Sequence, residues 1–209
     1  MKRGSLLKGQ AFRPLLAAWS GIWAYLKGSG MTLDDLRQAI ADNIKTKLPD
    51  LRDCRPHAGR FDLAELRRVA TKTPAVFIAC LGVKESELQE SGECDADLVM
   101  AAFVVTSDAK ALPKDVAALN IIEFLLLYIP GKQWGLGGKA FKAREVQAQN
   151  MYSGEVDKTG TAMWAASWRQ KVRLGESIWD ETGVLPSHVY FGIVPEVGIG
   201  HEEDYWEIT

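Results

Sequence analysis

One stretch of the chain, Thr159–Gly175, alternates so regularly that it constrains the fold more than any other. Five of its intervening positions are polar or basic, namely Thr161, Ser167, Arg169, Lys171 and Arg173. Successive side chains of a β-strand point to opposite faces, so the pattern predicts a long, half-buried strand with its tryptophans toward the core. The apolar face, broken only by Gln170, comprises Ala162, Trp164, Ala166, Trp168, Val172 and Leu174.

The three basic side chains of this strand face away from the predicted core. One interpretation is a solvated outer face, because runs of charge usually contact water. The other is a face built to lie against a second surface. Under that interpretation we expect the basic side chains to meet the acidic C-terminal arm of the same or a neighbouring chain, with DNA as the second choice.

Charge is segregated along the 209 residues. Residues 1–30 contain five Lys or Arg and no acid, whereas residues 176–209 contain eight acids and no Lys or Arg. We therefore predict a basic amphipathic arm over 1–30, a single domain over 31–175 and an acidic extended arm over 176–209. The oppositely charged ends either attract each other between copies or are both solvated.

The basic arm contains an apolar run over 15–26 that is too short to span a bilayer and is followed by no signal-peptide cleavage pattern. Its apolar residues recur at helical spacing, which predicts a short amphipathic helix on a Gly/Ser tether. We expect it to dock on its own body or a neighbouring copy rather than on a membrane. Met31 would also make a natural start, which would make the arm a dispensable leader. The residues that define the helix are Leu15, Trp19, Ile22, Trp23 and Leu26.

The body is predicted to be α+β, with a mixed, mainly antiparallel sheet of about four strands covered by two or three helices. Residues 84–95 are polar and acidic and are predicted to be a long hairpin loop, and 157–160 a turn. The predicted helices cover 32–48, 62–70 and 112–129, and the predicted strands cover 75–83, 98–106, 141–151 and 159–175, with a short extended piece at 51–54 that leads into a turn at Pro56–Gly59. The first helix is capped by Thr32, and its apolar face comprises Leu33, Leu36, Ile40, Ile44 and Leu48.

The third predicted helix is apolar around most of its circumference. Such a helix is covered on more than one side, and another subunit can supply part of that cover. We therefore take Phe124 and Tyr128 as candidate interface residues, and Tyr205 and Trp206 as apolar anchors within the acidic arm. One apolar stripe of the helix is predicted from Val116, Leu119, Ile122, Leu126 and Ile129.

The chain shows little that predicts chemistry. The Gly-rich stretch before Lys139 is not a phosphate-binding loop, because Gln133 and Ala140 occupy positions that need Gly and Ser or Thr. We predict no catalytic residue, no cofactor and no metal site, and hence no enzyme. The cysteines and histidines lack metal-ligand spacing, and an odd number of cysteines favours reduced thiols in a cytosolic setting. They are Cys54, Cys80, Cys94, His57, His188 and His201.

Several short segments carry a resemblance that covers roughly residues 31–175. They include the Thr32 helix, Gly59–Leu63, Pro74–Val76, Cys80–Gly82, Trp134–Gly135, Asn150–Ser153 and Gly160–Ala165 through Trp168 and Gln170. In these segments the chain resembles the tail-terminator-like, or tail-completion, proteins of Mu-like phages and prophages. Both arms lie outside the resemblance, which contains no catalytic motif.

The resemblance implies a structural virion protein, assembled in the host cytoplasm, that forms a ring of six copies. The ring would cap the tail tube, join it to head-completion (neck) proteins and let DNA pass through its lumen without sequence-specific binding. The 84–95 segment would meet the tube. The alternative is a small nucleic-acid-binding or DNA-processing module that uses the basic strand face. A nearly neutral body and inward tryptophans favour the first function.

Overall fold

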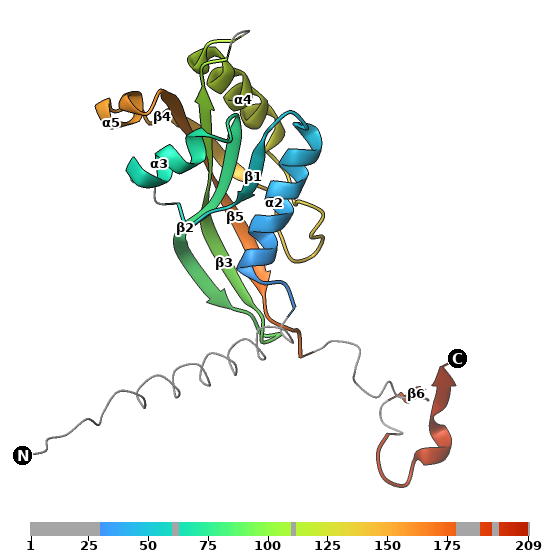
Figure 1. Ribbon diagram of the computed structural model, residues 1–209. Helices are drawn as coiled ribbons and strands as arrows, with labels where there is room; N and C mark the ends of the chain where they lie inside the picture. Colours follow the sequence, from blue (N-terminus) through green and yellow to red (C-terminus); the bar gives the residue numbers. More distant parts are fainter. Residues whose placement is uncertain (1–29, 60–62, 110–111, 179–188, 194–196, 209) are drawn as a thin grey trace, which may run out of the picture. The chain divides into compact units, whose positions relative to one another are not determined.

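The computed structural model describes residues 30–59, 63–109, 112–178, 189–193 and 197–208 (Figure 1). Contacts within the chain divide it into two units, Met1–Glu176 and Ser177–Thr209. The first unit contains the five-stranded sheet and the helices that cover it.

Helix α2 (Leu33–Lys47) begins at Thr32 because a capping box satisfies its first amides. The Asp35 amide donates to the Thr32 hydroxyl at 3.1 Å, and the Thr32 amide donates to the Asp35 carboxylate at 2.9 Å. The predicted apolar face is confirmed, since Leu36, Ile40 and Ile44 are fully buried. Helix α2 thus packs on the sheet with the face that the sequence pattern indicated.

The sheet has five strands in the order β1-β2-β3-β5-β4. The short β1 is parallel to β2, and every other neighbouring pair is antiparallel. The α+β class and the mixed, mainly antiparallel sheet are confirmed. The predicted extended piece near Cys54 forms β1, which brings the number of strands in this sheet to five. The strands are β1 (Asp53–Pro56), β2 (Ala75–Leu88), β3 (Cys94–Ser107), β4 (Arg144–Asn150) and β5 (Thr161–Leu174).

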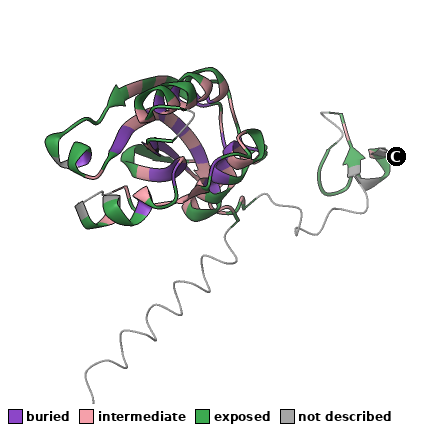
Figure 2. Cartoon of the chain, turned by 45° about the horizontal axis from the view of Figure 1, so that its top comes forward, coloured by how far each residue is buried: buried purple, intermediate pink, exposed green. Residues whose placement is uncertain are grey.

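Helices lie on both faces of the sheet. Helices α2 and α4 (Lys114–Tyr128) cover the inner face and enclose the larger core, which includes Trp168. Helices α3 (Leu63–Ala70) and α5 (Gly154–Lys158) cover part of the opposite, outer face, where Phe77 and Met163 belong to a smaller core. Buried residues accordingly gather between the sheet and its helices (Figure 2). The outer face beyond these two short helices is the part left for polar side chains.

The predicted loop over 84–95 is wrong, because β2 and β3 continue through most of it. Only residues 89–93 form the turn, which is closed by a 2.8 Å hydrogen bond from the Gln89 amide to the Glu93 carbonyl. The polar side chains arise from exposure of β2 and from ion pairs on β3, not from irregular backbone. Similarly, the first half of the predicted turn at 157–160 belongs to the short helix α5, which Ser153 caps through its hydroxyl, and only residues 159–160 form the turn.

The second unit contains a small hairpin of β6 (Val189–Phe191) and β7 (Trp206–Ile208), with a 3₁₀ turn at Glu202–Asp204. The rings of Phe191 and Trp206 stack with centroids 6.3 Å apart. The Gly198 amide donates to the Tyr205 hydroxyl at 2.8 Å. The acidic arm therefore has local structure around two of its predicted apolar anchors.

Candidate functional site

Gln170, which interrupts the apolar face of β5, lies at the centre of a buried hydrogen-bond network. Gln170 is fully buried, and its side-chain oxygen accepts from the indole N–H of Trp134 at 2.9 Å and of Trp168 at 3.2 Å. Its amide nitrogen donates to the Phe141 carbonyl. A buried polar group needs such partners, so Gln170 has a structural role that the alternation alone did not reveal.

The three basic residues of β5 are paired with carboxylates of the adjacent strand β3. Arg173 donates to both oxygens of Asp95 at 2.7 and 2.9 Å, and Lys171 lies 3.0 Å from the same carboxylate. Arg169 pairs with Asp97. Cross-strand register explains these pairs: Arg173 lies directly opposite Asp95, whereas Lys171, opposite Asp97, and Arg169, opposite Val99, each reach diagonally to the carboxylate two residues along β3. In the structure these basic side chains thus pair with carboxylates of β3, whereas the sequence suggested the acidic arm as their partner.

Asp95 is the most deeply buried of these carboxylates, with 4% of its surface exposed. Hydrogen bonds from Arg173, and then from Lys171, lower its pKa below the ordinary value despite burial. The hydrogen bond to Asp95 raises the pKa of the Arg173 guanidinium. Around neutral pH these groups therefore remain charged and paired, which leaves little of the basic face for an external phosphate.

The side of α4 that faces away from the sheet carries exposed apolar side chains, with the polar Asn120 and Glu123 among them. The predicted stripe is partly wrong, because Ile122 and Ile129 are buried but Ala118 and Leu125 complete the buried side. Leu127 is 79% exposed. Clusters of exposed apolar side chains on a helix commonly mark an interface. The other exposed members of this outward α4 face are Val116, Leu119 and Leu126.

Phe124 and Tyr128 lie at the margin of this face rather than at its centre. Both are half-buried against the larger core, and their rings stack with centroids 5.0 Å apart. Tyr128 also meets Trp134 edge-on at 6.3 Å, and the Lys132 ammonium lies 4.4 Å from the Tyr128 ring centroid. These contacts fix both half-buried rings against the body of the domain.

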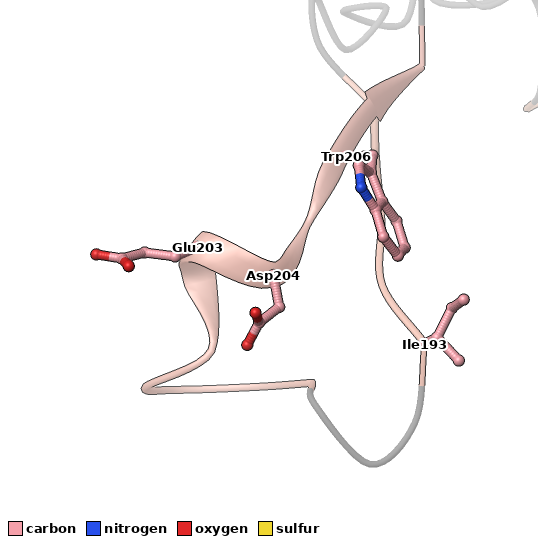
Figure 3. A pocket seen from close by; sticks show the side chains of 4 residues that line it. All are labelled: Ile193, Glu203, Asp204 and Trp206. Atoms are coloured by element: carbon pink, nitrogen blue, oxygen red, sulfur yellow. The ribbon is translucent and has the colours of Figure 1, made fainter.

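The remaining predicted interface residues lie elsewhere. Tyr205 and Trp206 belong to the second unit, where Trp206 is 57% exposed. Figure 3 shows Trp206 with Ile193, Glu203 and Asp204 around an open hollow of about 270 Å³. Trp19, Ile22 and Trp23 lie outside the described residues. Within the first unit, Phe124 and Tyr128 on α4 lie on the inner face of the sheet, whereas Arg169, Lys171 and Arg173 lie on the outer face of β5.

His57 lies in the turn that the sequence predicted. Its Nδ1 accepts from the Gly59 amide at 3.0 Å, and its Nε2 lies 3.0 Å from Glu65 of α3. Hydrogen bonds from Arg68, and then His57, lower the pKa of Glu65 to about 2. This pair connects the turn to α3, which is a structural role for the histidine.

The described residues offer little for chemistry. No group of three or more His, Cys, Asp or Glu side chains among them is placed to hold a metal ion. All three cysteines are free thiols, and burial raises the pKa of Cys54 to about 12. None of the helices in this part of the chain combines the length and apolar character required to span a membrane.

An open groove of about 490 Å³ lies over the outer face beside the basic residues of β5. Arg144 and Arg169 converge there on Asp97, and the Arg144–Asp97 separation is 2.6 Å. The groove floor is thus neutralised by its own ion pairs. Its lining residues are Lys84, Val99, Glu145, Val146, Gln147, Ser167, Trp168 and Arg169.

Comparisons of the chain with protein-family models and with curated proteins find no match.

Proposed function

We propose that the protein is a tail-terminator or tail-completion subunit of a phage virion, and that it forms a ring at the junction of head and tail. The observation that carries the proposal is the outward α4 face, whose apolar side chains remain 38% to 79% exposed within the described chain. A structural ring needs extensive contact surfaces between subunits and no reaction centre.

The outward α4 face can contribute substantially to association. Full burial of a Leu or Val side chain stabilises by about 1.5–3 kcal/mol, so covering a half-exposed one contributes about 1 kcal/mol. Leu119 is 48% exposed and Val116 is 43% exposed. Together with Leu126 and Leu127, they provide apolar contact area around the exposed Glu123, as the core of an interface does beside its polar groups.

The resemblance to tail-completion proteins supplies the assembly in which such a ring would work. The ring would be a homohexamer that caps the tail tube, binds a neck protein and surrounds passing DNA. Since 84–95 is mainly strand, we assign the contact with the tail tube to the hairpin tip at 89–93. Arg169, Lys171 and Arg173 are engaged with β3 carboxylates, so the nucleic-acid-binding alternative gains no support from the basic face.

The outward α4 face gives a direct test of assembly. In the Leu119→Lys/Leu127→Lys variant, two charges would have to be buried on association, so we expect monomers where the unchanged protein forms rings. Light scattering would measure the mass, and negative-stain images would detect rings alone and on added tail tubes. As a monomer, the variant should unfold at the same temperature as the monomeric form of the unchanged protein, because both positions are exposed.

A matched control is Gln38→Lys/Thr46→Lys, which adds the same charge to exposed positions of α2. This control should assemble like the unchanged protein. If the unchanged protein remains a monomer even with tail tubes present, the proposed function is wrong.

A further inference from the structure

Half of strand β2 has a free backbone edge. β2 runs over 14 residues, but β1 pairs only with Ala75–Ile78 at its start. Figure 1 shows β2 and β3 continuing well past the end of β1. From residue 82 to residue 88 no described backbone group pairs with the outer edge of β2, and all these side chains are exposed. Free strand edges are templates for another strand.

Two carboxylates on this edge differ from Asp95 and Asp97 on the same face in having no ion pair within the described part of the chain. Glu85 and Glu87 are opposite Asp97 and Asp95 in the β2–β3 register and so share their face. Asp95 and Asp97 have basic partners, whereas Glu85 and Glu87 have no ion pair with any described residue. Two like charges two residues apart favour a neighbouring strand that donates hydrogen bonds to them.

The edge is unsuited to pairing with itself. An antiparallel pair of β2 edges centred on Ser86 would place Glu85 of each copy opposite Glu87 of the other. Like charges directly opposite each other are destabilising. A two-fold contact through this edge is therefore disfavoured, and a different strand has to supply the partner.

Strand β4 provides a matching edge at the other side of the sheet. It is seven residues long and pairs on one side only, with β5. Because each step from β2 through β3 and β5 to β4 is antiparallel, β4 runs opposite to β2. A second copy can therefore place its β4 beside β2 and continue the antiparallel order.

The side chains of β4 also match those of β2. Gln147 and Gln149 are exposed and share the outer face with Ser167, whereas Val146 and Ala148 pack against the larger core on the inner face. The outer side of β4 thus presents amide donors that can bind carboxylates. Its inner side presents apolar groups that can meet Leu88, which is 75% exposed.

We propose that residues 84–88 of β2 pair with residues 146–150 of β4 in a second copy, with Glu87 opposite Gln147 and Glu85 opposite Gln149. Ser86 then faces Ala148, and Leu88 faces Val146. Each carboxylate accepts from a glutamine amide, which is a charge-assisted hydrogen bond. The two edges differ, so the contact is head-to-tail and repeats from copy to copy, as closed rings require. This inference rests on the proposed ring and names the strands that build it.

Opposite charges at the same two β4 positions test the pairing. Gln147→Glu/Gln149→Glu would place two new carboxylates opposite Glu85 and Glu87, which brings four carboxylates together, and we expect assembly to weaken at least tenfold in low salt. Gln147→Lys/Gln149→Lys should strengthen assembly several-fold, because it creates two ion pairs. Light scattering over a concentration series would measure both. Adding Glu85→Lys/Glu87→Lys to the glutamate variant should restore the rings, because the charges are then complementary.

Hydrogen exchange gives an independent readout on the backbone. Amides within 84–88 should exchange at least tenfold more slowly in rings than in the Leu119→Lys/Leu127→Lys monomer. If rings form but the glutamate and lysine variants assemble alike, or exchange in 84–88 does not change, edge pairing is wrong and the proposed function stands. If no rings form under any condition, both are wrong.

Discussion

Replacing Gln170 by leucine is expected to destabilise the body by roughly 3 kcal/mol. Leucine has a similar volume, but it leaves the buried indole N–H groups of Trp134 and Trp168 without their shared acceptor. Each buried donor left unpaired costs about 1–3 kcal/mol. Urea unfolding followed by far-UV circular dichroism would measure the loss as a lower midpoint with an unchanged slope.

The exposed Gln38→Leu variant is the control and should change the midpoint little. A double-mutant cycle separates the hydrogen bonds from packing. Trp134→Phe should reduce the free energy of unfolding less in the Gln170→Leu background than in the unchanged protein, because it then removes an indole N–H that has already lost its acceptor. Equal costs in both backgrounds would show that Gln170 contributes through its volume alone.

Replacing Asp95 by asparagine is expected to cost roughly 2 kcal/mol at pH 7. The substitution keeps the shape but removes the charge that Arg173 and Lys171 share. Removing one partner from a buried ion pair costs about 3–5 kcal/mol, and the two basic side chains here are about one third exposed, which reduces the penalty. Chemical unfolding of both proteins at several pH values would measure the difference.

The pH dependence has a definite sign. The pKa of Asp95 is lowered in the folded protein, so its contribution is fully present above the ordinary value of 3.8 and is lost as pH falls through the folded pKa. The stability difference between the two proteins should therefore be constant from pH 7 to pH 5 and shrink in stronger acid. Glu87→Gln, opposite Asp95 but without an ion pair, should show neither effect. A difference that persists unchanged in strong acid would rule out the charge as its cause.

Local signals in the sequence predicted most of the elements. The capping box at Thr32 and the apolar spacing of Leu36, Ile40 and Ile44 identified α2 and its buried face. Strict alternation identified β5 and placed Trp168 in the core, where it is almost fully buried. These predictions succeeded because each depends on residues that are neighbours in the chain.

The errors arose where partners are distant in sequence. Residues 84–95 looked like a loop because their acids had no visible partners, yet Asp95 pairs with residues almost eighty positions later. On α4 the apolar residues fill the circumference, so spacing alone could not tell the buried Leu125 from the exposed Leu127. Alternation of Glu85 and Glu87, continued by Asp95 and Asp97, was the signal that could have revealed the long hairpin.

The hydrogen bonds of Gln170 also bear on how many arrangements the chain can adopt. Sliding β5 by two residues keeps every side chain on its own face, so burial of apolar groups discriminates weakly against the slip. Such a slip would present Trp168 or Val172 to the Phe141 carbonyl and leave the glutamine without partners. A single polar residue in the core thus specifies the alignment of β5 with the 134–141 segment, and with it the position of the β4 edge along the sheet.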